Sequence, residues 1–503
     1  MYWHRSFADD NWKLNNPELI NHVSEIYDLL TPEDAMEKHS WLFHGWPELP
    51  SGERKSHDEY RQRIDEERRN ALEEISQALG LTGLLNLTEK SDRPDVVGFH
   101  MAEVLYESGA DQFIEDSCLG EENTNLVSLG IAYFVKRLTE EGSDWGEQLL
   151  ADVKNEEWDS AKAGDLFSAY PATLDLWVKL QSFGKGTEHR YWNRLNIYGL
   201  NASKEMLEFA VNKLVEYGRP KSAVEMIRFD KEEDSLPFEV VARILDAVLM
   251  ANQENNISLS GYEIEPLFLM IDAATDQHQE KMIQLEIQYS AILEDTKRGL
   301  KILSQLIENE PGWFVEMIRW KFKPKNEIAE EWSAEMSIEE RSNRASIAYR
   351  VIHAWHGVPG LKGNTLDKEF LVNWIASVRK GCSEIDRREV ADLEIGRVFA
   401  CAPEGDDSIK PMIEVREIIE ELKNRDIERG FYYGIVNSRG VTSRSMNEGG
   451  RQERELEQKY RSQSVALAAK WPRTSRILSL IADSYASGAM REDDDARLNG
   501  LRD

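Results

Sequence analysis

The sequence contains little cysteine and no long apolar segment. Its 503 residues include only three cysteines, Cys118, Cys382 and Cys401, which are too few and too widely spaced for a disulfide framework or a zinc knuckle. No stretch approaches the ~18 consecutive apolar residues of a transmembrane helix. The first ten residues also lack the apolar core of a secretory signal peptide. We therefore expect a cytoplasmic protein with no membrane partner.

Basic residues are scarce relative to acidic ones. The chain has 61 lysine and arginine residues against 92 aspartate and glutamate residues, which gives a formal net charge of −31. A field of this sign repels nucleic-acid phosphates, so we expect no nucleic-acid partner except where arginines cluster locally. The acidity favours solubility and can steer basic partners towards the protein.

The sequence lacks the common nucleotide-binding and zinc-protease motifs. The segment 184–187, Gly-Lys-Gly-Thr, has no upstream glycine and no preceding strand, so we interpret it as a turn between helices. His353 and His356 are three residues apart, as are His100 and Glu103, and each spacing places two side chains on one helix face. Because a metal needs further ligands, we interpret all three histidines as packed or surface residues. We expect no metal, no cofactor and no catalytic residue.

Two other features have chemical potential but simpler explanations. Cys401 lies before Ala402-Pro403, and a nucleophilic thiol would need a base that the sequence does not identify. We interpret Cys401 as a small buried hydrophobic residue. Asp406 and Asp407 could bind a cation or act as paired carboxylates. In a chain this acidic, a solvated loop is the favoured interpretation.

Helical periodicity dominates the chain. Residues 206–215 place apolar side chains at i, i+3, i+4 and i+7, and Gly218 and Pro220 then fit the end of one helix and the start of the next. Similar Gly- and Pro-punctuated helical segments recur, and no run of two-residue alternation competes with them. Hairpins of this size bury their apolar faces only by stacking. The sequence therefore predicts an all-α superhelical array of hairpins, an α-solenoid resembling tetratricopeptide or HEAT repeats, with a distinct all-α C-terminal part.

Changes in local composition and helical patterning divide the chain into three predicted parts. Residues 1–57 combine N-terminal helices with an aromatic, Pro-rich loop. Residues 58–330 form the predicted helical-repeat region. Residues 331–503 form a C-terminal helical domain with an Arg/Gly loop, because a polar, loosely patterned segment near residue 330 separates it from the repeats.

An arginine cluster is the strongest local exception to the acidic composition. Arg439, Arg444, Arg451 and Arg454 are interleaved with glycine and serine. Arginines in such a loop suit bidentate recognition of carboxylate or phosphate. They equally suit ion pairs with the many nearby glutamates, which would fix the loop to the helices. The sequence leaves both interpretations open.

Tryptophan is frequent, at 14 residues, and is favoured at binding surfaces because it buries a large area and carries a polar group. Trp41 and Trp46 fall in the predicted aromatic loop, where exposure is expected. They are therefore candidate binding residues. Trp177, Trp320 and Trp374 lie at core-like positions of predicted helices, where we expect burial.

Three short strings carry a resemblance to known proteins. They are the segment 437–441 with 448–454, the segment Trp471-Pro472-Arg473-Thr474, and the segment 46–50. They resemble the C-terminal helical-repeat regions of large bacterial proteins, some of which belong to antiviral-defence or signalling systems and carry an effector or NTPase domain ahead of the repeats. The resemblance implies that this chain is the C-terminal portion of a longer protein.

These observations favour a non-enzymatic helical scaffold that binds a protein partner. The resemblance adds that it serves as the sensor half of a bacterial defence or signalling protein. One alternative is a hydrolase or nucleotide-processing enzyme whose site gathers Asp406, Asp407 and Arg439 from distant helices. A second alternative is phosphate or nucleic-acid binding through the segment 439–454.

Overall fold

A computed structural model gives the fold of the chain. It describes the single positions 22, 25, 26, 47, 49 and 200 and the ranges 28–45, 56–106, 109–198, 202–229, 236–255, 259–326, 336–440, 442–445 and 448–500. Contacts divide the chain into two compact units. Unit 1 comprises residues 1–236 and 247–257, and unit 2 comprises residues 237–246 and 258–503. The predicted division at residues 57 and 330 stays a prediction.

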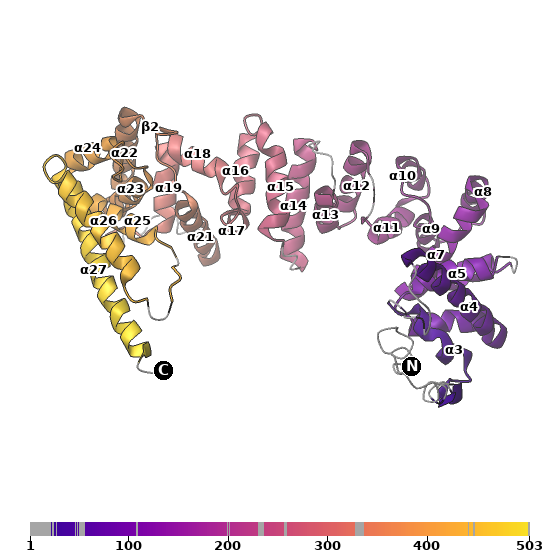
Figure 1. The fold of residues 1–503 in the computed structure, drawn as a ribbon. Coiled ribbons are helices and arrows are strands. Elements are labelled where there is room, and N and C mark those ends of the chain that lie inside the picture. Colours follow the sequence, from indigo (N-terminus) through magenta and orange to yellow (C-terminus); the bar gives the residue numbers. More distant parts are fainter. Residues whose placement is uncertain are drawn as a thin grey trace. The chain divides into compact units, whose positions relative to one another are not determined.

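The described chain is almost entirely α-helical, which confirms the all-α class (Figure 1). Within it, regular strands are limited to β1 (Leu361–Lys362) and β2 (Thr365–Leu366), which pair antiparallel with Leu361 opposite Leu366. Among the described residues, no helix is both long enough and apolar enough to cross a bilayer.

The described part of unit 1 is helical, and most of its helices are short, apart from the 31-residue α4 (His57–Leu87) and the 18-residue α7 (Thr124–Glu141). In chain order they are α3 (Ala35–His39), η1 (Ser40–Phe43), α4 (His57–Leu87), η2 (Thr88–Lys90), α5 (Pro94–Val104), α6 (Asp111–Cys118), α7 (Thr124–Glu141), α8 (Ser143–Asn155), α9 (Ser160–Phe167), α10 (Leu174–Gln181), α11 (Lys185–Arg194), α12 (Lys204–Glu216) and α13 (Pro220–Phe229). Helices close in sequence pack together: α5 on α4 and α7, α9 on α11, and α12 on α13. Helix α14 (Phe238–Asn255) has residues in both units.

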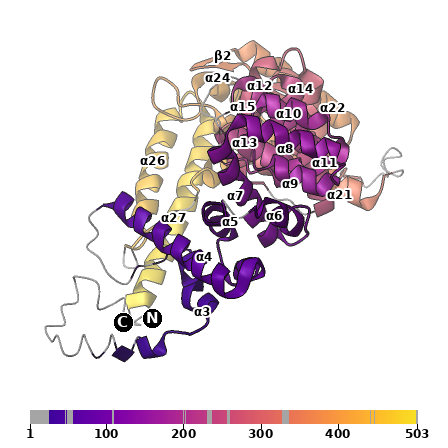
Figure 2. The same ribbon diagram turned by 90° about the vertical axis from the view of Figure 1, so that its right-hand side faces the viewer.

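Unit 2 ends in a pair of long helices. Its elements after α14 are α15 (Gly261–Ile271), η3 (Asp272–Ala274), α16 (Gln279–Gln288), α17 (Ser290–Leu293), α18 (Lys301–Asn309), α19 (Pro311–Lys321), α21 (Ile338–Ala354), the two strands, α22 (Lys368–Glu384), α23 (Arg388–Cys401), α24 (Ile413–Leu422), α25 (Arg425–Asn437), α26 (Arg451–Leu467) and α27 (Pro472–Gly500). Helix α19 packs on α21 and α22, and α23 packs on α25. Helices α26 and α27 lie side by side in both views (Figures 1 and 2).

Glycine and proline mark helix ends where the sequence predicts them. Gly218 adopts the left-handed region at φ 77° after α12, a conformation that glycine reaches without steric cost. Pro220 then begins α13, where its missing N–H leaves no hydrogen bond unmade. The predicted hairpin over this segment is confirmed.

Glycine acts differently in α25, where two glycines lie inside the helix and do not end it. Helix α25 continues through Gly430 and Gly434 to Asn437. A Cβ at Gly430 would overlap the Leu393 carbonyl oxygen of α23, and a Cβ at Gly396 would overlap the Ile427 carbonyl oxygen of α25. The two glycines therefore let the helix backbones approach closely. This packing outweighs the lower helix propensity of glycine.

A glycine also allows α5 to approach α7 closely in unit 1. A Cβ at Gly98 would overlap the Leu129 carbonyl oxygen. Gly98 is buried where α5 packs on α7. Each unit thus contains a helix crossing that tolerates only glycine at the contact point.

We predict that Gly430→Ala destabilises unit 2 by about 1–3 kcal/mol, because an added methyl group forces the α23 and α25 backbones apart. The matched control is Gly312→Ala in α19, where a Cβ would meet no atom within 4 Å. There alanine should leave stability unchanged or raise it by up to about 1 kcal/mol. Thermal unfolding followed by circular dichroism measures both. Equal melting temperatures for the two variants would contradict the crossing.

Candidate functional site

The predicted arginine cluster is a set of ion pairs. Arg439 and Arg444 both reach Oε1 of Glu453, at 2.7 and 2.8 Å. Arg444 also contacts a carboxylate oxygen of Glu492 on α27, at 2.8 Å. The Glu453 side chain is only 4% exposed. The two arginines therefore connect the segment before α26 to the α26 and α27 helices.

Two of the four arginines lie on a helix, so their assignment to a loop is wrong. Helix α26 begins at Arg451, and Arg451 and Arg454 belong to its first turn. Arg454 contacts Asp493 at 2.5 Å. Arg451, whose side chain is 73% exposed, contacts Glu455 at 3.3 Å. Each predicted arginine thus has a carboxylate partner, as the ion-pair interpretation expects, and a role in binding stays a prediction.

The pKa of Glu453 reflects this arrangement. Burial alone would raise it, but hydrogen bonds from Arg444 and Arg439 outweigh burial and lower the pKa below its usual range. A carboxylate with a lowered folded-state pKa stabilises the fold above its unfolded-state pKa. That contribution is lost as the pH falls through the folded-state value.

The predicted tryptophan sites differ in outcome. Trp41 lies in the short helix η1 and is half-buried rather than exposed in a loop. Trp46 lies outside the described residues. Trp177 and Trp374 are buried, as predicted. Trp320 is only half-buried, and its indole N–H donates to Glu316 at 2.7 Å.

Asp407, one member of the acidic pair in the enzymatic alternative, makes a structural contact. Asp407 accepts two hydrogen bonds from Arg416, at 2.6 and 2.7 Å. The pKa of Asp407 is lowered chiefly by this bond. Arg416 is fully buried, whereas Arg439 pairs with Glu453. Asp407 and Arg439 therefore have different ionic partners.

The predicted histidine and cysteine candidates have ordinary partners. His100 contacts Glu103 at 2.9 Å and Asp65 at 3.3 Å through its two ring nitrogens. Across the described ranges, no group of three or more His, Cys, Asp or Glu side chains could hold a metal ion. Cys401 donates to the Arg397 carbonyl oxygen at 3.6 Å, and burial raises its pKa. Its thiol is therefore not activated as a nucleophile.

The structure nevertheless brings three of these residues together. His353, His356 and Cys401 line one cavity of about 530 Å³ in unit 2, hereafter the unit 2 cavity. They come from α21, the segment after it, and the end of α23. Sequence spacing linked the two histidines to each other but gave no signal that joined them to Cys401.

A second cavity, hereafter the unit 1 cavity, has a volume of about 690 Å³ and lies beside the crossing of α5 and α7. Its apolar wall includes Val96 and Phe99 of α5. Helix α7 adds Ser128, Ile131, Ala132 and Val135, at i, i+3, i+4 and i+7. Phe99 is 38% exposed and Val135 is 37% exposed. This spacing puts one helix face on the cavity.

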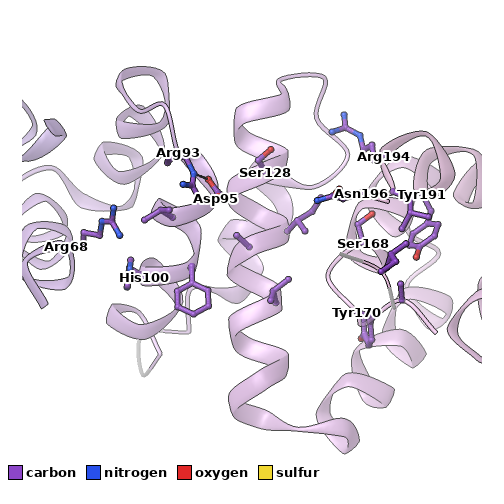
Figure 3. Close-up of a pocket in the computed structure, with 18 of the residues that line it drawn as sticks. Arg68, Arg93, Asp95, His100, Ser128, Ser168, Tyr170, Tyr191, Arg194 and Asn196 are labelled. Carbon is purple, nitrogen blue, oxygen red and sulfur yellow. Dashed lines mark hydrogen bonds and ion pairs between the residues drawn. The ribbon is translucent and has the colours of Figure 1, made fainter. Parts of the chain in front are cut away.

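Polar side chains lie at both ends of the unit 1 cavity (Figure 3). Arg93 pairs with Asp95 at 2.7 Å. Arg68 pairs with Asp65 at 3.3 Å, and its Nε donates to the Leu42 carbonyl oxygen at 3.0 Å. At the opposite end, Arg194 lies near Asn196 and Tyr191, and its Nε is 3.3 Å from Asp165. The charged lining groups therefore all have partners within unit 1.

Sequence reasoning missed the unit 1 cavity, although α7 carries a signal for it. The helix has a buried face with Val127, Tyr133 and Phe134. Its second, mostly apolar face consists of residues 128, 131, 132 and 135. A helix with apolar residues on two faces must either be fully buried or leave one face for a partner. The cavity shows which face remains accessible.

No protein-family model, curated protein or solved structure matches the chain. The sequence resemblance to bacterial helical-repeat regions therefore stays an expectation.

We predict that the double variant Arg439→Ala/Arg444→Ala loses about 1.5–3 kcal/mol of stability at pH 7, because it leaves the Glu453 carboxylate without its charged donors. The loss should shrink as the pH falls through the folded-state pKa of Glu453, because the protonated carboxyl group no longer depends on charged donors. The control is Arg451→Ala, whose exposed pair should contribute less than about 0.5 kcal/mol. Urea unfolding at several pH values measures all three proteins. A loss that does not change with pH would contradict the role of Glu453.

Proposed function

We propose that the protein is a non-enzymatic helical scaffold that binds a protein partner through the unit 1 cavity. In this proposal, successive helical hairpins stack as an α-solenoid and present inner helix faces to the partner. The observation that carries the proposal is the partly exposed apolar wall formed by α5 and α7. Such a wall loses contact with water only when another surface covers it.

The polar groups around this wall are suited to recognition rather than catalysis. Both ring nitrogens of His100 face carboxylates. The Tyr191 hydroxyl accepts a hydrogen bond from the Trp177 indole at 2.7 Å, and burial raises the pKa of Tyr191 to about 12. The Tyr170 hydroxyl donates to the Gly146 carbonyl oxygen at 2.7 Å. These groups have no free base or nucleophile to offer a substrate.

The dimensions and charges of the cavity suit an amphipathic segment of the partner. Residues 128–135 of α7 span about 10 Å, which corresponds to two helical turns. The lining includes three arginines, Arg68, Arg93 and Arg194, against two carboxylates, Asp65 and Asp95. An apolar helix face flanked by acidic residues would match this surface. If the protein is the sensor half of a defence or signalling protein, as the sequence resemblance implies, binding of this partner is the event that it senses.

We predict that Val135→Asp abolishes capture of the partner from the native cells, because it places a charge in the apolar wall. The control is Val178→Asp on α10, which lies outside the cavity and is 56% exposed. Both variants should melt within a few degrees of the parent protein. Affinity capture with and without phage infection, quantified by mass spectrometry, should show a partner that is lost with Val135→Asp and retained with Val178→Asp. The proposal fails if both variants capture the same proteins in the same amounts.

A further inference from the structure

The unit 2 cavity combines an apolar lining with a small set of charged side chains. Helices α19, α21, α23 and α25 surround it. Its volume of about 530 Å³ lies within the range of small-molecule sites, which are mostly apolar with a few converging polar groups. It belongs to a different unit from the cavity of the proposed function and contains different chemistry.

Positive charge exceeds negative charge in this cavity, although the chain as a whole is strongly acidic. Lys321 and Arg397 both line it, and Glu394 is the one carboxylate among its described lining residues. The two cations contact the same oxygen, Oε1 of Glu394, at 3.0 and 2.9 Å. The lysine, arginine and glutamate side chains of the lining therefore carry two positive charges against one negative charge.

The ammonium group of Lys321 is held away from water. Its side chain is only 9% exposed, and that of Glu394 only 3%. The pKa of Lys321 is lowered, first by burial and also by the positive charge of Arg397, while Glu394 acts in the opposite direction. The Arg397 side chain, in contrast, is 41% exposed. Lys321 is therefore the buried cation of this group, and a buried charge is costly unless it is paired.

Both cations keep hydrogen-bond donors for such an anion. Within the described structure, the Lys321 ammonium makes one hydrogen bond, to Glu394, and the Arg397 guanidinium makes one, to the same oxygen. An ammonium group has three donors and a guanidinium has five. The remaining donors that face the cavity can bind a carboxylate or a phosphate.

The walls next to these donors are aromatic. The Lys321 ammonium lies 5.1 Å from the ring centre of Phe322 and 5.5 Å from that of Tyr349. The Tyr349 ring stacks on His353 with an interplanar angle of 17°. Trp355 completes the apolar lining with Ile352 and Val398. A planar apolar group fits against such faces.

We propose that the unit 2 cavity binds a small organic anion, with a carboxylate or phosphate head between Lys321 and Arg397 and a planar apolar body against Tyr349 and Phe322. The head would supply the negative charge that this cluster of two cations and one carboxylate lacks. The apolar body would cover the aromatic walls.

Isothermal titration calorimetry on the full chain tests this with three probes. Phenyl phosphate and benzoate carry both the anionic head and the ring, and their relative affinities show which head is preferred. Benzyl alcohol carries the ring alone. We expect saturable binding of at least one anionic probe at millimolar concentration or below, and at least tenfold weaker binding of benzyl alcohol.

Two variants and a control locate the binding. Arg397→Gln should weaken the anionic probe at least tenfold by removing one charged donor. The control is Arg388→Gln on the same helix, which pairs with Asp392 and does not line the cavity. Its affinity should stay within about twofold of the parent protein. Tyr349→Ala removes a ring that is 55% exposed, and should also weaken binding.

The proposal is overturned if neither anionic probe binds saturably, or if benzyl alcohol binds as tightly as they do. It is also overturned if Arg397→Gln and Tyr349→Ala both retain the parent affinity. None of these outcomes affects capture of a protein partner through the unit 1 cavity, so the two proposals fail independently.

Discussion

Close contact between helix backbones at glycine is the constraint on which both cavities depend. Gly396 lies between Glu394 and Arg397 in α23, and its contact with α25 fixes how that helix presents the two side chains. Gly98 lies between Val96 and Phe99 in α5, and its contact with α7 similarly fixes the apolar wall of the unit 1 cavity. At this contact a methyl group would have to displace backbone rather than a flexible side chain. The positions of the lining residues therefore depend on a contact between helix backbones.

The large acidic excess has a local structural use. Buried carboxylates collect basic side chains from other helices: Glu453 binds two arginines, Asp165 lies beside Arg190 and Arg194, and Glu428 contacts Arg473. The clustered arginines that are conspicuous in the sequence are thus mostly paired with carboxylates that no sequence pattern singles out. The unit 2 cavity has the same ratio of two cations to one carboxylate, but there the charged group borders an open volume of about 530 Å³.

The helices could largely be predicted from the sequence, whereas the cavities could not. Apolar periodicity and the Gly218-Arg219-Pro220 turn are local signals, and they correctly predict α12 and α13. Local rules fail for α25, because glycine has a low helix propensity. Only the packing of α25 on α23 explains why its two glycines lie inside the helix. The unit 2 cavity joins Lys321 to Arg397 across 76 positions of the sequence. No spacing rule connects residues so far apart, and only the packing of α19 on α23 brings them together.

A site framed by main-chain contacts can change its ligand more readily than one framed by interlocking side chains. The α23 and α25 backbones approach closely at Gly396 and Gly430, a contact that does not involve Tyr349 or Phe322. Related chains that keep these two glycines could differ freely at the two aromatic positions. They would then retain one scaffold while diverging in the molecules they recognise.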